Sequence, residues 1–289
     1  MIAARKKKET TNRVLVTGGA GYVGSACVKA LCDSGYRVTA FDNLANGEKK
    51  YVDERATFVA GDVRDENALQ KVFKALSPDT VIHAAALKAV GESEEQPGYY
   101  FTNNVSGTLN VLKAASEHGV EHFIFSSTAA VYRPSGSGIY KESDPSRAIS
   151  VYGNSKIMAE TLITEFARTG KIPAYTIFRY FNVAGDIGLH FIEKNPQNLF
   201  PLLARSFSDD AAFNVFGNDY ATPDGTCVRD YIHVGDVADA HVRAISDGKT
   251  GVFNLGIGKG YSVLELIALF GEAAGKDVSY TFAERRRGD

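Results

Sequence analysis

A tyrosine and a lysine stand four residues apart in Ser150-Val-Tyr-Gly-Asn-Ser-Lys156, and together they can do acid–base chemistry. Residues at positions i and i+4 lie on one face of a helix, so the ammonium group of Lys156 is expected near the phenol of Tyr152. A phenol has an ordinary pKa of about 10, and burial raises it further. To act as a base at neutral pH, Tyr152 must lose about 3 pKa units, or roughly 4 kcal/mol, so nearby positive charge must outweigh burial.

A glycine-rich turn near the start of the chain predicts a second partner for that chemistry. Gly18-Gly-Ala-Gly-Tyr-Val-Gly24 follows a strand expected over Arg13–Thr17 and precedes a helix expected over Val23–Ser34. The turn contains Gly-x-Gly-x-x-Gly, which lets the pyrophosphate of a dinucleotide reach a helix N-terminus. No Gly-Lys-Ser/Thr follows, which disfavours a nucleoside-triphosphate loop. The oxidised nicotinamide of such a dinucleotide would bring a second cation to Tyr152.

Two carboxylates at strand ends extend the predicted dinucleotide site. Asp42 follows a strand expected over Tyr36–Phe41. A carboxylate at this point accepts ribose hydroxyls and repels a 2′-phosphate, so NAD is favoured over NADP. Asp62 follows a strand expected over Ala56–Ala60, where it can meet the adenine amino group. The alternatives are an ordinary turn residue for Asp42 and a helix N-cap for Asp62.

Hydroxyl groups at another strand end complete the chemistry. Ser126-Ser-Thr128 lies at the C-terminal end of a strand expected over His122–Ser126, and open parallel α/β sheets bind ligands at that edge. Thr128 can therefore hydrogen-bond a substrate hydroxyl that lies between a sugar and the phenolate. A Tyr-x-x-x-Lys spacing by itself is common on exposed helices. Its combination with Thr128 and the glycine turn predicts hydride transfer between an alcohol carbon and NAD, with Tyr152 as the base.

Strands and helices alternate along the first 180 residues. Further helices are expected over Glu66–Leu76, Pro97–His118 and Tyr152–Thr169, and further strands over Thr80–Ala84 and Ala174–Tyr180. This order predicts an α/β fold, a doubly wound parallel sheet of Rossmann type. After Asn182, turn-rich segments alternate with short strands and with helices over 235–246 and 262–274. We predict a flexible tail over 1–12, an NAD-binding domain over 13–181 and a smaller α/β substrate domain over 182–289, interleaved with the first.

Composition excludes several classes of partner. The chain has 289 residues, of which 32 are lysine or arginine and 34 are acidic, and a net charge of −2 gives no support for nucleic-acid binding. No apolar run has membrane-spanning length, so no membrane is expected. The three cysteines and six histidines lack metal-ligand spacing, so no metal is predicted. Cys27 and Cys32 fall on one expected helix and are interpreted as buried, reduced residues of a cytoplasmic enzyme.

Taken together, these motifs resemble the extended short-chain dehydrogenase/reductases. Four segments resemble, more narrowly, the UDP-glucose 4-epimerases of that family: His83–Ser93, Arg179–Asn182, Phe216–Tyr220 and Asp224–Val234. The resemblance covers residues 13–289. It implies reversible NAD-dependent inversion at C4 of a UDP-hexose, through a 4-keto intermediate. It also implies a homodimer that packs its helices around 101–115 and 152–166 into a four-helix interface.

The resemblance implies a set of site residues. Thr128 and Tyr152 would be the catalytic pair. Lys156 would lower the pKa of the phenol and bind the nicotinamide ribose. NAD would be bound by Gly18, Gly21, Tyr22, Val23, Gly24, Asp42, Asn43, Asp62, Val63, Ala84, Ala85, Lys88, Asn103, Ser126, Tyr152, Lys156 and Tyr180. The UDP-sugar would be bound by Lys88, Thr128, Tyr152, Asn182, Asn198, Leu199, Phe216, Arg229, Arg286 and Asp289.

Plainer interpretations stand beside several of these assignments. Arg229 and Arg286 would take the diphosphate, which suits a guanidinium fork, but Arg229 could instead pair with Asp230. Lys88 could be a solvated turn residue. His233 is interpreted as a core histidine without a catalytic part.

Rival functions also stay open. Sugar-nucleotide 4,6-dehydratases usually carry Asp-Glu after the strand threonine, where this chain has Ala129-Ala130. The substrate could be another UDP-sugar, an N-acetylhexosamine, pentose or uronate, because selectivity lies in loops. A non-catalytic NAD-binding regulator would commonly lack the Tyr152/Lys156 pair. Similar enzymes continue for several tens of residues beyond the position of Asp289, so a truncated substrate domain is expected.

Overall fold

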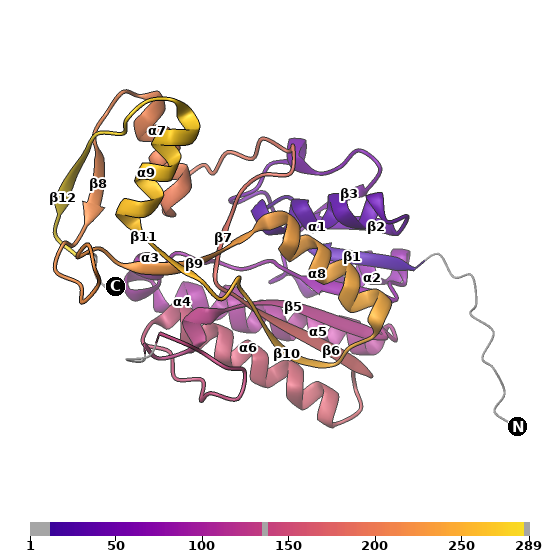
Figure 1. Cartoon of the computed structure of the whole chain (residues 1–289). Helices are drawn as coiled ribbons and strands as arrows, with labels where there is room; N and C mark the ends of the chain where they lie inside the picture. The colour runs from indigo at the N-terminus through magenta and orange to yellow at the C-terminus, as the bar shows by residue number, and fades with distance from the viewer. Residues whose placement is uncertain (1–11, 135–137, 286–289) are drawn as a thin grey trace, which may run out of the picture.

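The computed structural model describes residues 12–134 and 138–285. Seven parallel strands form its main sheet, in the spatial order β10-β6-β5-β4-β1-β2-β3 (Figure 1). These strands are β1 (Arg13–Thr17), β2 (Arg37–Asp42), β3 (Thr57–Ala60), β4 (Thr80–His83), β5 (His122–Thr128), β6 (Ala174–Tyr180) and β10 (Gly251–Leu255). The order reverses beside β1, which places the carboxyl ends of β1 and β4 at a topological switch point. The predicted parallel, doubly wound sheet is therefore confirmed.

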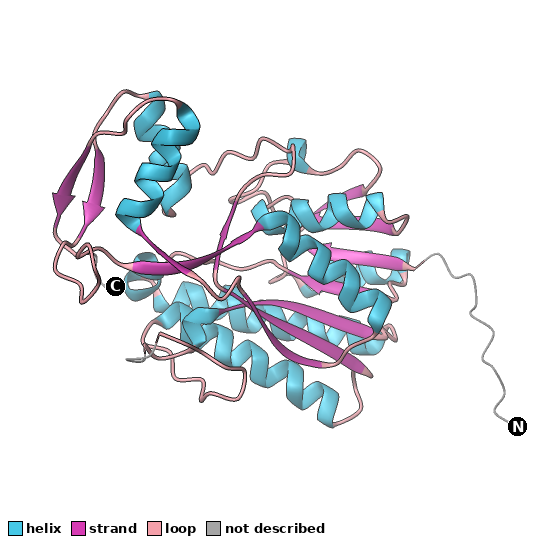
Figure 2. Ribbon diagram, viewed as in Figure 1, coloured by secondary structure: helices cyan, strands magenta, loops and turns pink. Residues whose placement is uncertain are grey.

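Helices cover both faces of this sheet (Figure 2). The helices α1 (Tyr22–Asp33) and α8 (Val234–Asp247) share a buried core with one face, and α2 (Glu66–Leu76), α5 (Gly107–Glu117) and α6 (Val151–Arg168) share a core with the other. Side chains alternate along each strand as a two-sided sheet requires. In β5, for example, Ile124 packs on the α1 side, whereas Phe123 and Phe125 pack on the α6 side.

A smaller unit follows β6. It holds a three-stranded sheet of β7 (Asn182–Ala184), β9 (Val228–His233) and β11 (Gly260–Ser262), the parallel pair β8 (Phe213–Phe216) and β12 (Tyr280–Ala283), and helices α7 (Leu199–Ser208) and α9 (Val263–Ala274). Leu203, Val215 and Ile267 lie in a core of its own. Between these elements the chain returns to the main body to supply α8 and β10, as Figure 1 shows. The division at residue 182 stays a prediction, and the predicted tail falls almost entirely outside the described residues.

The helix expected over Pro97–His118 contains a wider turn that the sequence pattern did not indicate. It consists of α4 (Pro97–Tyr100), a π-helical segment over Phe101–Ser106 and α5; the shorter α3 (Val90–Glu95) precedes it. A π-turn holds an extra residue, which changes the direction of the side chains within it. Asn103 and Asn104 are thereby buried although they are polar.

Helix ends are fixed by local hydrogen bonds. The Ser150 hydroxyl accepts from the Gly153 amide at 3.0 Å, so α6 begins just before Tyr152. At the start of α8, His233 Nδ1 accepts from the Gly235 amide at 3.1 Å, and the His233 side chain is exposed. The interpretation of His233 as a core histidine is therefore wrong, because its ring serves as a helix cap. Within the described ranges, no helix is long and apolar enough to cross a membrane.

A buried ion pair fixes α6 on the sheet. Arg179 of β6 donates to Glu160 of α6 through Nη2 at 2.6 Å and Nε at 3.1 Å, and both side chains are less than 10% exposed. Ser127 donates to the same carboxylate at 2.5 Å, and Arg179 Nη1 donates to the Tyr132 hydroxyl at 2.8 Å. Because every member of the group is hydrogen-bonded, neither charge is left unpaired in the core.

Removing one member of this pair should destabilise the protein strongly. Glu160→Leu leaves the Arg179 charge buried without its partner, so we expect the free energy of unfolding to fall by about 3–5 kcal/mol. The double variant Glu160→Leu/Arg179→Met should recover most of this loss, because it buries no charge. Urea denaturation measures both effects. Glu165→Leu, which breaks the exposed Glu165–Arg168 pair, is the control and should cost less than about 1 kcal/mol. A Glu160→Leu protein as stable as the wild type would contradict this account.

Candidate active site

The structure brings the predicted catalytic groups together at the carboxyl edge of β5. Thr128 is the last residue of β5, and its hydroxyl forms a hydrogen bond with the phenol of Tyr152. One helical turn beyond Tyr152, Lys156 Nζ donates to the Ser126 carbonyl at 2.8 Å and lies 4.5 Å from the centre of the Phe125 ring. Lys156 is only 3% exposed. The hydroxyl and the phenol thus meet at the end of β5, and the ammonium group is buried against the same strand.

Burial shifts the pKa values of Tyr152 and Lys156 in opposite directions. Burial raises the pKa of Tyr152 to about 12, and the hydrogen bond from Thr128 is what lowers it. Burial lowers the pKa of Lys156 to about 7, against the opposing charge of Glu160. Desolvation is the largest influence on both groups, and the tuning of the phenol by Lys156 stays a prediction.

A chain of hydrogen bonds holds Tyr152 from behind. Asn104, in the π-turn, donates to the Ser155 hydroxyl at 3.0 Å, and Ser155 donates to the Tyr152 carbonyl at 2.7 Å. The Asn104 side-chain oxygen also accepts from the Leu87 amide at 2.9 Å and from Asn103 at 3.0 Å. Sequence reasoning assigned Asn103 to the site but missed Asn104. The signal was available, since two adjacent asparagines interrupt an apolar helix.

The glycine turn has the shape that a dinucleotide requires. A Cβ on Gly18, whose φ is +72°, would lie 2.6 Å from the Ala85 nitrogen, and a Cβ on Gly24 would lie 1.9 Å from the Gly18 oxygen. Glycine is thus obligatory where the turn meets Ala84 and Ala85. Gly21 is the N-cap of α1, and no side chain caps the helix there. The first amides of α1, which include those of Tyr22 and Val23, are oriented to receive a phosphate group.

The carboxylates at the strand ends are held in place by neighbours. Asp42, at the end of β2, accepts from the Ala20 amide at 3.0 Å and the Leu44 amide at 2.7 Å, and a carboxylate has lone pairs left for ribose hydroxyls. Asn43 donates to Asp62 at 2.8 Å. The cap of α2 is Asp65, not Asp62, so the helix-cap alternative for Asp62 is wrong. Arg64 binds Asp62 and lowers the pKa of its carboxyl group.

A segment of the smaller unit, residues 185–194, lies across this turn. The Tyr22 hydroxyl donates to the Gly185 carbonyl at 2.5 Å, and the Phe191 ring packs 5.4 Å from the ring of Tyr22. Lys88, which is half exposed, forms an ion pair with Glu193. The second carboxylate oxygen of Glu193 is buried, with no hydrogen-bond partner in the described part of the chain. Sequence reasoning missed Glu193 because 105 residues separate it from Lys88.

The remaining predicted residues divide between two places. Val63 packs beneath Gly107 at the start of α5, and Tyr180 ends β6 beside Ser126. The residues implied for the sugar nucleotide lie on the smaller unit: Asn182 in β7, Asn198 and Leu199 at the start of α7, Phe216 in β8 and Arg229 in β9. The neighbouring Asp230 carboxylate accepts from the amides of Ile257 and Gly258. Arg286 and Asp289 lie outside the described residues, and the roles of this whole group stay predictions.

Two of the cysteines lie on α1. Cys27 is buried in α1 as expected, and burial raises the pKa of its thiol to about 12. Cys32 is only partly buried, contrary to expectation, because it lies near the outer end of α1.

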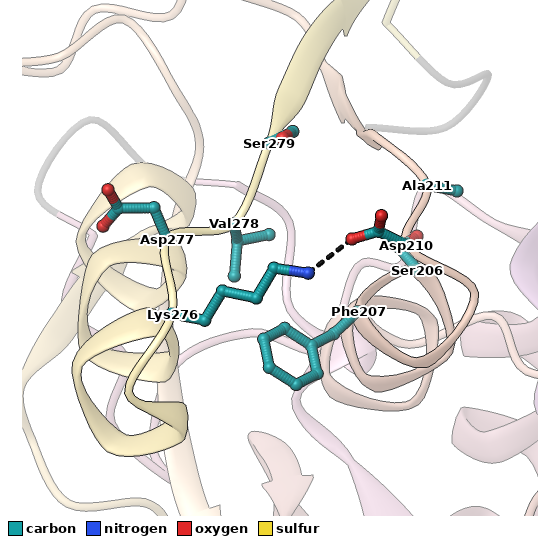
Figure 3. Close-up of a pocket in the computed structure, with 8 residues that line it drawn as sticks. All are labelled: Ser206, Phe207, Asp210, Ala211, Lys276, Asp277, Val278 and Ser279. Carbon is teal, nitrogen blue, oxygen red and sulfur yellow. Dashed lines mark hydrogen bonds and ion pairs between the residues drawn. The ribbon is translucent and has the colours of Figure 1, made fainter.

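A pocket on the smaller unit lies away from these groups. It is formed between the end of α7 and the chain that follows α9 (Figure 3). Lys276 reaches across it to pair with Asp210 and lies over the Phe207 ring. None of the predicted site residues that the structure describes lines this pocket, so we assign the chemistry to the edge of the main sheet.

Comparison with known proteins identifies the family of the chain. Residues 14–256 match the NAD dependent epimerase/dehydratase family. The chain belongs to this family. It is 43% identical to the UDP-glucose 4-epimerase of Yersinia pestis, with 96% of this chain and 87% of the relative aligned. It is 40% identical to the UDP-glucose 4-epimerase of Bacillus subtilis, with 96% and 86% aligned.

Solved structures agree. The chain is similar to UDP-glucose 4-epimerase from Bifidobacterium longum in complex with NAD+ and UDP, at 39% identity and a TM-score of 0.90, covering 96% of this chain and 88% of that one. It is equally similar in fold to the Brucella ovis enzyme in complex with NAD, at 37% identity and a TM-score of 0.90 over 96% and 87% of the two chains. The predicted family, fold class and cofactor are confirmed.

The buried Lys156 should lower stability in a pH-dependent way. Its pKa falls from 10.5 to about 7 on folding, so between these values the unfolded chain holds a proton that the folded cofactor-free protein lacks. We expect Lys156→Met to raise the free energy of unfolding by roughly 2–4 kcal/mol below pH 7 and to give no gain above about pH 10.5. Urea denaturation from pH 6 to 10.5 tests this expectation. Lys71→Met, at an exposed position, should show no such trend.

Proposed function

We propose that the chain catalyses reversible inversion at C4 of a UDP-hexose, interconverting UDP-glucose and UDP-galactose with NAD as cofactor. The observation that carries this proposal is the hydrogen bond between Thr128 and Tyr152, with Lys156 bound to Ser126 of the same strand, at the sheet edge that also holds the glycine turn. Its relatives supply the substrate class, because those at about 40% identity are UDP-glucose 4-epimerases.

Each residue of the site has its own role in this reaction. NAD, when bound, supplies a hydride acceptor and a positive charge. Tyr152 takes the proton from the 4-hydroxyl group, and Thr128 hydrogen-bonds the phenol and the sugar hydroxyl. Lys156, held by the Ser126 carbonyl, binds the nicotinamide ribose. After the 4-keto sugar has turned about its diphosphate link, Tyr152 returns the proton on the product side.

Binding energy from the UDP group explains how one site can serve both faces of the sugar. The diphosphate and uridine anchor the substrate while the hexose is held loosely, so binding remote from C4 serves the reaction at C4. Arg229, on β9 of the smaller unit, and Arg286 supply the guanidinium groups for this anchor. The hexose then meets the main body and UDP meets the smaller unit.

Tyr152→Phe should abolish turnover while leaving UDP binding nearly intact. Removing the phenolic oxygen removes the base, so we expect the rate of epimerisation to fall by about 10³-fold or more. Proton NMR of UDP-glucose, and in parallel UDP-N-acetylglucosamine, detects the C4-inverted product, and calorimetry measures the affinity for UDP. Tyr36→Phe, at the opposite end of the sheet, should retain the wild-type rate. A Tyr152→Phe protein that keeps most of its rate would disprove the assignment of the base.

We further propose a cytoplasmic homodimer. The free thiols of Cys27 and Cys32 suit a reducing compartment. The exposed Met158 on α6 lies among partly buried apolar residues of the same surface, which include Leu162. This face of α6, together with α5, would pack against its own copy.

The dimer has a direct test. Light scattering should give a mass of twice the 31.2 kDa of one chain. Met158→Glu places like charges at the symmetric interface and should shift the mass toward that of a single chain. Wild-type protein with the mass of one chain at micromolar concentration would remove the proposal.

A further inference from the structure

A buried line of polar groups runs from the active site into α8. The Tyr180 hydroxyl lies 2.9 Å from Ser126 Oγ and 2.8 Å from His241 Nε2, and His241 Nδ1 lies 2.7 Å from the Val237 carbonyl oxygen. Ser126 is 7% exposed, Tyr180 8% and His241 0%. The three side chains come from β5, β6 and α8, so the line crosses from the sheet to the helix that covers it.

The donors and acceptors in this line can be assigned one after another. A carbonyl oxygen only accepts, so His241 Nδ1 carries a proton. Burial lowers the pKa of His241 to about 4, so the ring is neutral at pH 7 and Nε2 is an acceptor. Tyr180 has one phenolic proton, which must go to Nε2. The Ser126 hydroxyl must then donate its own proton to the Tyr180 oxygen.

With these assignments, the Ser126 hydroxyl proton is used in the hydrogen bond to Tyr180. Ser126 Oγ can therefore only accept a further hydrogen bond. Ser126 stands where a ligand would meet it, because its carbonyl receives Lys156 Nζ and Thr128 follows two residues later on β5. Burial raises the pKa of Tyr180, and Cys27 of α1 and Tyr152 lie close enough to add to that rise. The line therefore ends between the catalytic helix and the helix of the glycine turn.

We propose that His241 is a positioning residue that acts through Tyr180 to hold Ser126 Oγ as a hydrogen-bond acceptor for the amide N–H of the nicotinamide carboxamide. The proposal rests on the use of NAD and assigns a part to a residue that does not touch the cofactor. An amide N–H is the donor that distinguishes the carboxamide from other carbonyl substituents of a pyridine ring. Fixing Ser126 as an acceptor would thus select for it.

A purely structural histidine would have different consequences, and the chain holds one for comparison. His122 begins the same strand β5, its Nε2 lies 2.8 Å from Thr176 Oγ1, and burial lowers its pKa to about 4. It is buried and bonded to a hydroxyl, as His241 is, but it lies at the end of β5 opposite to Ser126. Loss of His122 should lower stability without any effect specific to the carboxamide.

The test compares two dinucleotides that differ only in the group under question. In the 3-acetylpyridine analogue of NAD, a methyl ketone replaces the carboxamide, so the carbonyl remains and the N–H is lost. Titration calorimetry on protein freed of copurified NAD gives the dissociation constant of each. We expect the wild type to favour NAD by about tenfold, the worth of one hydrogen bond, beyond any difference in ring stacking.

The variants separate positioning from structure. His241→Phe removes the acceptor of the Tyr180 hydroxyl proton. The Tyr180 hydroxyl can then donate to Ser126 Oγ, so the Ser126 hydroxyl becomes a donor toward the cofactor. The ratio of the two dissociation constants should therefore shrink toward unity. His241→Gln keeps a side-chain oxygen that accepts from Tyr180 and should restore most of the preference. His122→Phe should keep the wild-type ratio even where both affinities fall.

Two outcomes would overturn the proposal. One is a His241→Phe protein that binds both dinucleotides more weakly by the same factor, because that result indicates a structural role only. The other applies if His241→Phe does not fold: Tyr180→Phe also frees the Ser126 proton, and an unchanged ratio in that variant would refute the proposal equally. The ratio is a binding measurement that needs no epimerase turnover, so failure of the proposed function would be seen separately, in the NMR assay.

Discussion

Lys156 is buried beneath the carboxyl edge of the sheet. The arrangement of the site depends on the free-energy cost of removing its ammonium group from water. Burial alone pulls its pKa to about 7. The Ser126 carbonyl, the face of the Phe125 ring and the more distant charge of Glu160 offset part of that cost. Glu160 is in turn neutralised by Arg179, so a single chain of interactions joins the ammonium group to the core. The buried ammonium group serves the reaction but lowers the free energy of unfolding of the protein.

The same desolvation governs Tyr152. With a pKa of about 12, its phenol is protonated at neutral pH when only the protein's own residues act on it. The positive charge of oxidised nicotinamide is a further influence that can lower this value. Base strength and cofactor state are thereby linked, because the phenol becomes a base where a hydride acceptor is in place. This link would limit proton abstraction to molecules that can complete the hydride transfer.

Polar groups behind the site serve this arrangement without entering it. Asn104 holds α6 at Tyr152 through Ser155, and it reaches that position because a π-turn rotates it inward. On the opposite face of the sheet, His241 orients Tyr180 and Ser126. Since each buried group is hydrogen-bonded, the networks restrict the side chains of the site to few conformations. The two networks come from opposite faces of the sheet and meet at the end of β5.

The sequence by itself determined the features that depend on neighbours along the chain. Strand and helix periods predicted six strands of the main sheet, Gly18 to Gly24 predicted the dinucleotide turn, and the spacing of Tyr152 and Lys156 placed both on one helix face. These signals are local, since backbone geometry and side-chain period act over a few residues. Only the tertiary structure decided which distant groups meet: Lys88 with Glu193, Glu160 with Arg179, and Tyr180 with His241. It also decided the protonation of Tyr152 and the exposure of His233, because desolvation depends on everything packed around a group and not on its place in the chain.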